Sequence, residues 1–188
     1  KYQFFVFSDE CYNDFYEGQT PISCLDFPKS DRWVVFRSLS KRSHMTGFRS
    51  GAIMSKNTQL MTLLKKSRSP IGVGTPTSIQ QGAIAALQQP QAWFDHNNAV
   101  YQERREQVWK LAEAMGCIFS RNNSGMFVWA KLPEGHTNSE DFIDELLQEK
   151  HIFLAPGTIF GSAGQGYIRF SLCVEKSQIT EALNRLDK

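Results

Sequence analysis

The sequence predicts an α/β region followed by a small α+β region, and three observations support this fold class. Up to about residue 90, short apolar runs of strand length alternate with stretches that have helical periodicity. A single long amphipathic stretch then covers residues 91–115. Beyond it, apolar runs and amphipathic stretches form a second group, with turn residues between them. The chain has 188 residues, 41% of them hydrophobic, so it can bury a proper core.

Three apolar runs of the first region are predicted to be buried strands. Residues 2–8 are bounded by acidic residues, and residues 32–37 follow a stretch that is rich in turn residues. Residues 50–55 form the third run. Each run is short enough for a strand and too short for a core helix.

Two helices are predicted to complete the first region. Asn57 is expected to cap a helix whose inner side carries Leu60, Met61, Leu63 and Leu64. A loop rich in glycine and proline follows at residues 69–77. Thr77 or Ser78 then begins a helix that continues through Leu87.

The long helix at residues 91–115 is predicted to join the two regions. Its apolar stripe repeats every seven residues, at Phe94, Tyr101, Val108 and Met115. The second region is expected to contain strands on both sides of a turn at residues 122–125, a helix at about 139–149, strands at 151–155 and 166–172, and a final helix with Ile179, Ala182, Leu183 and Leu186 on one face.

Composition and charge argue against several classes of function. The formal net charge is only +2, so neither a nucleic acid nor a membrane surface is expected as the main partner. The charged clusters at residues 65–68 and 103–106 are interpreted as solvated helix faces. The four cysteines are widely spaced without a C-x-x-C pair, which argues against a metal site or a disulfide framework and favours the cytoplasm. No apolar run approaches the length of a membrane span.

Asp9 and Tyr12 directly follow the first predicted strand. Ligand sites in open α/β sheets gather at the carboxyl ends of the strands, so both side chains are candidates for binding a ligand. An ordinary role for Asp9 in capping or in a turn is the alternative that its position leaves open.

Lys41 follows the second predicted strand and is surrounded in sequence by Ser38, Ser40 and Arg49. Serine hydroxyls and an arginine are suited to binding a phosphate group. A lysine that lies beside other cations holds its proton less tightly, which favours Schiff-base chemistry. An exposed lysine without a special role is the alternative. The nucleotide-binding P-loop pattern is absent from the sequence.

Arg169 lies on the predicted strand at residues 166–172, at a position that we interpret as inward-facing. An arginine in such a position seldom lacks a partner, because burying an unpaired charge is unfavourable. A ligand carboxylate is one candidate partner, and an aspartate or glutamate of the chain itself is the other.

Taken together, these residues resemble the class I and II aminotransferases, which have the fold type I architecture and depend on pyridoxal phosphate. SDECYNDFYEG matches the family pattern D-x-x-Y, and SLSKRSHMTGFRSG matches S-x-[SA]-K followed by G-x-R-x-G. APGTIFGSAGQGYIRFS matches PG-x-x-FG ending in an arginine on a strand, and TPTSIQQGAIAAL and SGMFVWAKLP support the match. The motifs occur in the family's order and spacing over nearly the whole chain.

The resemblance covers roughly the second half of such a protein. It implies that residues 1–90 are the C-terminal part of the cofactor-binding large domain, a mixed, mostly parallel sheet with helices. Residues 91–115 would be the interdomain helix, and residues 116–188 would be the small C-terminal α+β domain. The missing half is expected to hold the phosphate-gripping loop and the residue that stacks on the cofactor ring, so we expect this chain by itself to be inactive.

The resemblance also implies three catalytic roles. Lys41 would form a Schiff base with pyridoxal 5′-phosphate and then act as general acid and base. Asp9 would pair with the ring nitrogen and keep it protonated. Tyr12 would donate a hydrogen bond to the phenolic oxygen of the ring.

Four further contacts follow from the resemblance. Ser38 and Arg49 would bind the cofactor phosphate, with Ser40 as an additional hydroxyl. Arg169 would bind the α-carboxylate of the substrate as a bidentate pair. No metal is expected.

The implied activity is transfer of an amino group from an α-amino acid to a 2-oxo acid, by a cytoplasmic homodimer of the full-length protein. SLSKRS and FRSGA are similar to enzymes that act on N-succinyl-diaminopimelate, and aspartate-type or aromatic substrates remain open. Two other functions are compatible with the same fold. One is a carbon–sulfur lyase or decarboxylase, and the other is a ligand-sensing domain of a transcription regulator.

Overall fold

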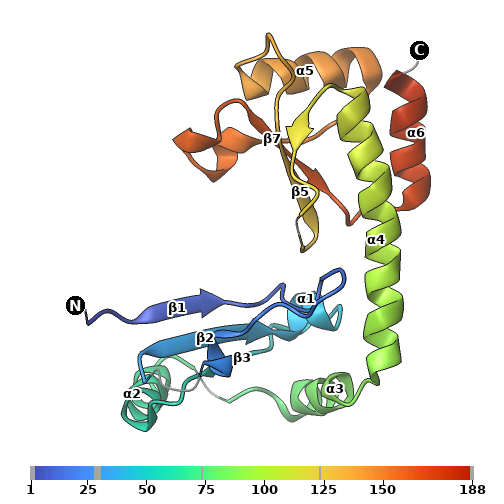
Figure 1. Ribbon diagram of the computed structural model, residues 1–188. Coiled ribbons are helices and arrows are strands. Elements are labelled where there is room, and N and C mark those ends of the chain that lie inside the picture. Colours follow the sequence, from blue (N-terminus) through green and yellow to red (C-terminus); the bar gives the residue numbers. More distant parts are fainter. Residues whose placement is uncertain (1–2, 28–30, 73, 123, 187–188) are drawn as a thin grey trace. The chain divides into compact units, whose positions relative to one another are not determined.

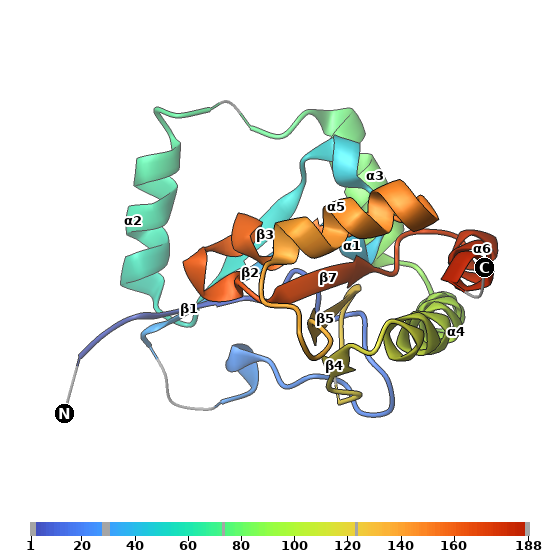
Figure 2. The same ribbon diagram turned by 90° about the horizontal axis from the view of Figure 1, so that it is seen from above.

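The computed structural model describes residues 3–27, 31–72, 74–122 and 124–186, and it consists of two compact units (Figures 1 and 2). The first unit is Lys1–Phe94 and the second is Asp95–Lys188. The division falls inside α4 (Gln91–Ala114), the predicted long helix, near its first turn. None of the helices formed by the described residues combines the length and the apolar character that crossing a membrane requires.

The first unit contains a three-stranded mixed sheet in the order β1-β2-β3. β1 (Val6–Asp9) and β2 (Trp33–Ser38) are parallel neighbours, whereas β3 (Gly51–Met54) pairs antiparallel with β2. All three predicted strands form, but only β2 is buried as predicted. β1 and β3 are largely exposed, and β1 starts only at Val6: residues 3–5 are exposed and outside the strand, and residue 2 lies outside the described residues. β1 and β2 each continue one residue beyond the predicted end, which brings Asp9 and Ser38 into the sheet.

Both predicted helices of the first unit are confirmed. α2 (Thr58–Arg68) begins where expected, because the side chain of Asn57 accepts a hydrogen bond from the Leu60 backbone N–H at 2.9 Å. α3 (Thr77–Leu87) has the predicted bounds. Three short helical turns complete this unit: η1 (Cys24–Asp26), α1 (Leu39–Arg42) and η2 (Thr46–Phe48).

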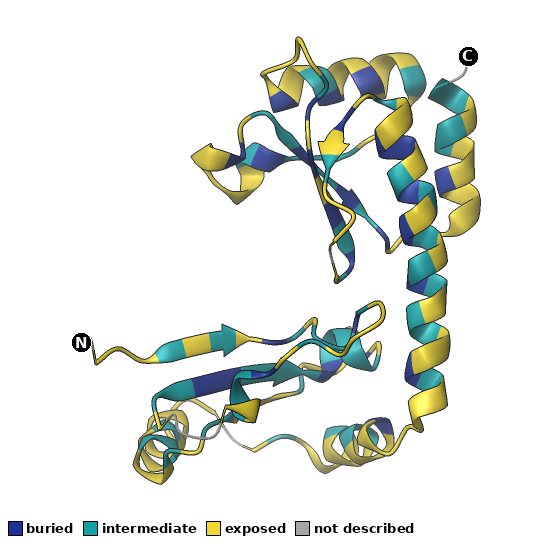
Figure 3. Ribbon diagram, in the orientation of Figure 1, coloured by how far each residue is buried: buried dark blue, intermediate teal, exposed yellow. Residues whose placement is uncertain are grey.

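The core of the first unit is small. Val34 and Val35 are fully buried in β2, and Leu39, Met45 and Ala86 form a separate apolar cluster between α1 and α3. α2 has no buried residue, as Figure 3 shows. Leu63 is 59% exposed, so its predicted inward position is wrong, whereas Leu60, Met61 and Leu64 are partly buried.

The second unit contains a four-stranded antiparallel sheet in the order β4-β5-β7-β6. β4 (Ile118–Phe119) and β5 (Phe127–Lys131) form the predicted hairpin. β7 (Tyr167–Ser171) lies in the middle and pairs with both β5 and β6 (Ala155–Pro156). Because side chains alternate along a strand, one face of this sheet is buried, at Val128, Ala130, Ile168 and Phe170.

Three helices complete the second unit. α5 (Ser139–Lys150) has nearly the predicted bounds, and α6 (Lys176–Leu186) contains all four residues predicted for one face of the final helix. α4 and α6 run side by side (Figures 1 and 2), and both contribute residues to a cavity that Phe170 of β7 also lines. The predicted stripe of α4 is buried in this unit at Tyr101 and Val108.

The predicted strand at residues 151–155 is largely wrong. His151 ends α5 in a left-handed conformation with φ of 55°, and its N–H donates to the carbonyl oxygens of Leu146 and Leu147. The chain reaches the sheet only at Ala155 and Pro156. Pro156 has no backbone N–H to donate, which limits the pairing of this edge strand.

The prediction of a solvated helix face is wrong for Arg105. This residue is only 2% exposed, and its Nη2 donates to the carbonyl oxygen of Gly125 at 2.5 Å. The acceptor lies 20 residues further along the chain, so helical periodicity alone does not reveal the contact. Residues 65–68, by contrast, are exposed as predicted.

Candidate active site

The polar residues that follow β1 and β2 lie at one edge of the first sheet. The two strands are parallel, so their carboxyl ends meet at the same edge. Asp9 ends β1, and Ser38 ends β2 immediately before α1, which carries Lys41. β3 begins at Gly51 opposite Ser38, and this register brings the preceding Arg49 to the same edge. The structure therefore gathers three segments that are separated in sequence.

Asp9 is held by the turn that follows β1. Its Oδ1 accepts a hydrogen bond from the Cys11 backbone N–H at 3.0 Å, so Asp9 does have the turn role that the sequence left open. Hydrogen bonds from the Cys11 side chain and then its backbone hold the pKa of the Asp9 carboxyl below its ordinary value of 3.8. Asp9 is also exposed, and it is therefore available as a negative charge at neutral pH.

Lys41 is half-buried on α1, and Ser38 fixes the start of this single turn. Ser38 Oγ accepts a hydrogen bond from the Ser40 backbone N–H at 3.1 Å and donates to the Ser50 carbonyl oxygen at 3.5 Å. Among the residues that the structure describes, none forms a hydrogen bond or an ion pair with the Lys41 ammonium. The amine is thus neither fully exposed nor neutralised by a neighbouring carboxylate.

Arg49 adopts an uncommon backbone conformation for a residue with a side chain. Its φ of 51° and ψ of 43° lie in the left-handed region. Its Nη1 donates to the Thr46 carbonyl oxygen at 3.1 Å, and Thr46 Oγ1 donates to the Ser40 carbonyl oxygen at 3.0 Å. These bonds connect the Arg49 side chain to the segment that carries Lys41. No described carboxylate pairs with Arg49, so its charge is available to an anion.

Gly51 is required because β2 passes too close for a side chain. A Cβ at this position would lie 2.7 Å from the Arg37 carbonyl oxygen and 3.5 Å from the Ser38 Cα. The last glycine of G-x-R-x-G is therefore explained by strand packing beside Ser38. The first glycine of that pattern, Gly47, has open space around it.

Tyr12 and Ser40 belong to segments that already carry a candidate residue. Tyr12 is 38% exposed and lies in the turn that Asp9 begins. Ser40 is half-buried on α1, directly before Lys41. β1 therefore places Tyr12 near Asp9, and α1 places Ser40 beside Lys41.

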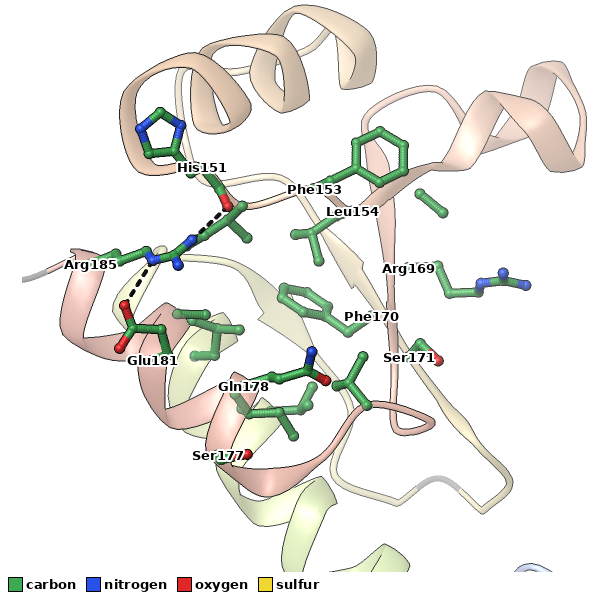
Figure 4. A pocket seen from close by; sticks show the side chains of 17 residues that line it. His151, Phe153, Leu154, Arg169, Phe170, Ser171, Ser177, Gln178, Glu181 and Arg185 are labelled. Carbon is green, nitrogen blue, oxygen red and sulfur yellow. Dashed lines mark hydrogen bonds and ion pairs between the residues drawn. The ribbon is translucent and has the colours of Figure 1, made fainter.

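Arg169 belongs to the second unit and lies on β7. Figure 4 shows its side chain leaving the strand in the opposite direction from Phe170, whose ring is in the buried core. This orientation corrects the predicted inward-facing position. The guanidinium carbon lies 4.1 Å from the centre of the Phe127 ring and 4.4 Å from the centre of the Phe160 ring. Two aromatic rings therefore hold the cation.

No carboxylate among the described residues forms an ion pair with Arg169. Its Nε is buried without a hydrogen-bond partner. Aromatic faces attract a cation, but they do not satisfy the five N–H donors in the guanidinium plane. Of the two partners that the sequence left open, the internal acid is absent from the described part of the chain, and donors remain for an anionic ligand.

The glycine-rich loop before β7 brings Phe160 to Arg169. The loop consists of η3 (Gly157–Phe160) and η4 (Ser162–Gly164), which pack on one another. A Cβ on Gly157 would lie 2.1 Å from the Gly164 carbonyl oxygen, and a Cβ on Gly164 would lie 2.0 Å from the Gly157 carbonyl oxygen. Only glycine fits at both positions of this crossing.

A cavity of about 670 Å³ lies in the second unit (Figure 4). Its lining comes from α4, α6, β7 and residues 151–155, and it includes Arg185, which donates to the His151 carbonyl oxygen at 2.9 Å. Of the predicted site residues, Arg169 lines this cavity, whereas none of the six predicted to bind the cofactor does. We therefore do not assign the reaction to it.

Two aromatic contacts of Arg169 were missed by sequence reasoning. Phe127 lies on β5, whose register places Trp129 opposite Arg169, so strand pairing is the signal that could have indicated an aromatic environment. Phe160 is part of the PG-x-x-FG match, but its contact with Arg169 depends on how the loop folds back.

Comparison with known proteins identifies the family. The family model "Aminotransferase class I and II" matches residues 1–186, and the chain belongs to this family. An LL-diaminopimelate aminotransferase of Maridesulfovibrio salexigens is 35% identical over 191 residues, which cover 100% of this chain and 49% of that protein. The chain spans about half the length of the curated relatives it matches.

Solved structures show the same fold. An aminotransferase from Staphylococcus aureus matches with a TM-score of 0.87 and 31% identity, covering 97% of this chain and 48% of that chain. A probable N-succinyldiaminopimelate aminotransferase from Thermus thermophilus matches with a TM-score of 0.87 and 27% identity, and the match covers 97% of this chain and 49% of that chain. The predicted family and fold class are confirmed. Members of this family depend on pyridoxal phosphate.

The side chains at the edge of the first sheet fit that cofactor. Asp9 supplies a negative charge that complements a protonated ring nitrogen. Lys41 supplies an amine that can react with the aldehyde of the cofactor, and no described carboxylate pairs with this amine. Arg49 supplies a similarly unpaired guanidinium, which complements a phosphate.

Proposed function

We propose that the protein to which this chain belongs is a pyridoxal-phosphate-dependent aminotransferase, which transfers the amino group of an α-amino acid to a 2-oxo acid. One observation carries the proposal. Asp9, Lys41 and Arg49 lie at the same edge of one sheet, and both cations lack a carboxylate partner among the described residues. Family membership over residues 1–186 supports it.

When bound, pyridoxal phosphate supplies an aldehyde that reacts with amines and a ring that accepts the electron pair released at the substrate Cα. Arg49 and the hydroxyls of Ser38 and Ser40 would bind its phosphate. Tyr12 would donate a hydrogen bond to its phenolic oxygen. Asp9 would hold the proton on its ring nitrogen, since the low pKa of this carboxyl keeps it ionised.

Lys41 is the residue to which we assign proton transfer. Its Nζ would take the proton from the substrate Cα and return it to C4′ of the cofactor. The anchored position of α1 suits this role, because a proton carrier must be held within hydrogen-bond reach of both carbon atoms.

Arg169 would bind the α-carboxylate of the amino acid. Its in-plane donors can form a bidentate pair, while Phe127 and Phe160 restrict the guanidinium plane. The first unit would then be part of the cofactor-binding large domain, α4 the interdomain helix, and the rest of the second unit the small domain. We further propose that the full-length protein acts as a homodimer in the cytoplasm.

The substrate is proposed from the names of relatives. Curated relatives of the chain, among them the protein of Maridesulfovibrio salexigens, are named LL-diaminopimelate aminotransferases. LL-diaminopimelate is therefore the first amino donor to test. Aspartate and aromatic amino acids are the next candidates. The same names favour transamination over carbon–sulfur cleavage or ligand sensing.

Chemical trapping in the full-length protein tests the assignment of Lys41. The protein is incubated with pyridoxal phosphate, its visible absorption spectrum is recorded, and borohydride reduction followed by peptide mass spectrometry locates the attached cofactor. We expect the label on Lys41 and its loss in Lys41→Ala. Lys56→Ala is the matched control, because the Lys56 amine already donates to the Leu25 and Phe27 carbonyl oxygens.

Transamination is tested with the same protein. The amino donor should remove the visible absorption band of the bound cofactor, and a 2-oxo acid should restore it. A wild-type protein without such a band, or one labelled at a different lysine, would refute the proposal.

A further inference from the structure

We propose that Glu10, Arg37, Asp14 and Arg42 form an ion-pair chain that positions the Lys41 helix for the reaction. The inference rests on the function proposed above, and it assigns these four as positioning residues. Arg37 Nη2 lies 3.1 Å from Glu10 Oε2, and Arg37 Nη1 lies 3.5 Å from Asp14 Oδ2. Arg42 Nε lies 3.6 Å from Asp14 Oδ1. Asp14 therefore connects the two arginines, and Arg37 connects the two carboxylates.

Glu10 is the fixed end of the chain. It is only 3% exposed, and its carboxylate accepts hydrogen bonds from the Cys24 backbone N–H at 2.8 Å, Ser8 Oγ at 3.2 Å and Asn13 Nδ2 at 3.4 Å. A buried carboxylate with this many donors is well satisfied. Its position is consequently set by β1 and the segment that follows it.

Arg42 is the other end of the chain and comes directly after Lys41. Its Nη1 donates to the Ala86 carbonyl oxygen of α3 at 3.2 Å, and its guanidinium carbon lies 4.3 Å from the centre of the Phe94 ring. α1 has only four residues, and such a short helix has little stability of its own. The contacts of Arg42 therefore fix the rotation of α1, and with it the direction in which Lys41 leaves the helix.

The ion pairs lie on the opposite face of the sheet from the candidate site. Arg37 alternates with Ser38 along β2, and Ser8, which donates to Glu10, alternates with Asp9 along β1, so the ion pairs and these two site residues lie on opposite faces. The chain of charges can thus hold the ends of β1 and β2 in register without occupying the space of a ligand. It acts on the site through the backbone.

A second anion site is not supported by the same residues. A cavity of about 260 Å³ beside the ion pairs is lined by Arg37, Arg42 and Asp14, among others. Two arginines face two carboxylates, so no positive charge is left over for an anion. Positioning accounts for the arrangement, whereas anion binding does not.

Asp14→Asn in the full-length protein tests the proposal, because it removes the central charge and keeps the size of the side chain. Asp14→Glu is the conservative variant. Val35→Ala is the matched control for stability, since it removes buried methyl groups from β2 and leaves every charge in place. The measurements are thermal stability, hydrogen exchange of residues 38–46, kcat and KM, and the pH titration of the visible absorption band of the bound cofactor.

We expect Asp14→Asn to accelerate hydrogen exchange at residues 38–46 and to shift the midpoint of the absorption titration. Misalignment of a reacting group should lower kcat by roughly 10- to 100-fold, with a much smaller change in KM. Asp14→Glu should recover part of this loss. Val35→Ala should lower thermal stability without changing kcat, the titration midpoint or the local exchange.

Equal kinetic and exchange effects in Asp14→Asn and Val35→Ala would overturn the positioning role, and so would unchanged kcat and exchange in Asp14→Asn. A wild-type protein that binds no cofactor would refute the proposed function instead. In that case hydrogen exchange still tests whether the ion pairs hold α1, because the measurement needs no cofactor. Faster exchange at residues 38–46 in Asp14→Asn would support the positioning role, and unchanged exchange would contradict it.

Discussion

Replacing Gly164 by alanine should destabilise the second unit and displace Phe160 from Arg169. The added Cβ would lie 2.0 Å from the Gly157 carbonyl oxygen and 2.3 Å from its carbonyl carbon, whereas real Cβ atoms essentially never approach closer than 3.0 Å. The two backbone segments would have to separate by the difference, about 1 Å. Since η3 carries Phe160, that separation should also loosen the contact with Arg169.

The expected magnitude follows from the kind of neighbour. Inserting a methyl group into a well-packed site lowers the free energy of unfolding by about 1–3 kcal/mol. The neighbours of this Cβ are backbone atoms, which cannot rotate away as a flexible side chain does, so we expect a value near the upper end, about 3 kcal/mol. For a domain of 150–250 residues, this corresponds to a decrease in Tm of about 6–12 °C.

Thermal unfolding of the full-length protein, followed by calorimetry, measures this effect. Gly72→Ala is the matched control, because a Cβ at residue 72 meets no atom within 4 Å. The KM for the amino acid should rise in Gly164→Ala and stay unchanged in Gly72→Ala. If the two variants differ in Tm by less than ~1 °C, the reasoning from the close crossing of Gly157 and Gly164 is refuted.

Two further predictions concern single side chains. Arg169→Lys should raise the KM for the amino acid about tenfold with little change in Tm, because lysine keeps the charge but loses the paired in-plane donors. Steady-state kinetics measures this change, and an unchanged KM would contradict the role of Arg169. Burial raises the pKa of the Cys117 thiol from 9.0 to about 11, so the folded state holds this proton more tightly than the unfolded state does. The free energy of unfolding should therefore fall as the pH rises from about 9 to about 11. Urea denaturation across this range should show a shallower decrease in Cys117→Ala, and an equal decrease would contradict the assignment.

Most helices and strands were predictable because their signals are local. Asn57 caps α2 within the first helical turn, and the apolar stripe of α4 reports its periodicity without reference to other segments. The motifs likewise identified Asp9, Lys41 and Arg49 as candidates from their own surroundings in sequence. Their meeting at one edge follows from two tertiary facts, the parallel pairing of β1 with β2 and the antiparallel pairing of β3 with β2.

Contacts between distant segments were decided only by the tertiary structure. One partner of Arg105 is a carbonyl group 20 residues away, and the two rings that enclose Arg169 come from β5 and from the folded loop of η3 and η4. The bridge from Glu10 through Arg37 likewise requires the register of two strands. Such contacts depend on which surfaces pack together, and the geometry of packing is set by the whole chain, whereas caps and periodicity are set by neighbours within a few residues.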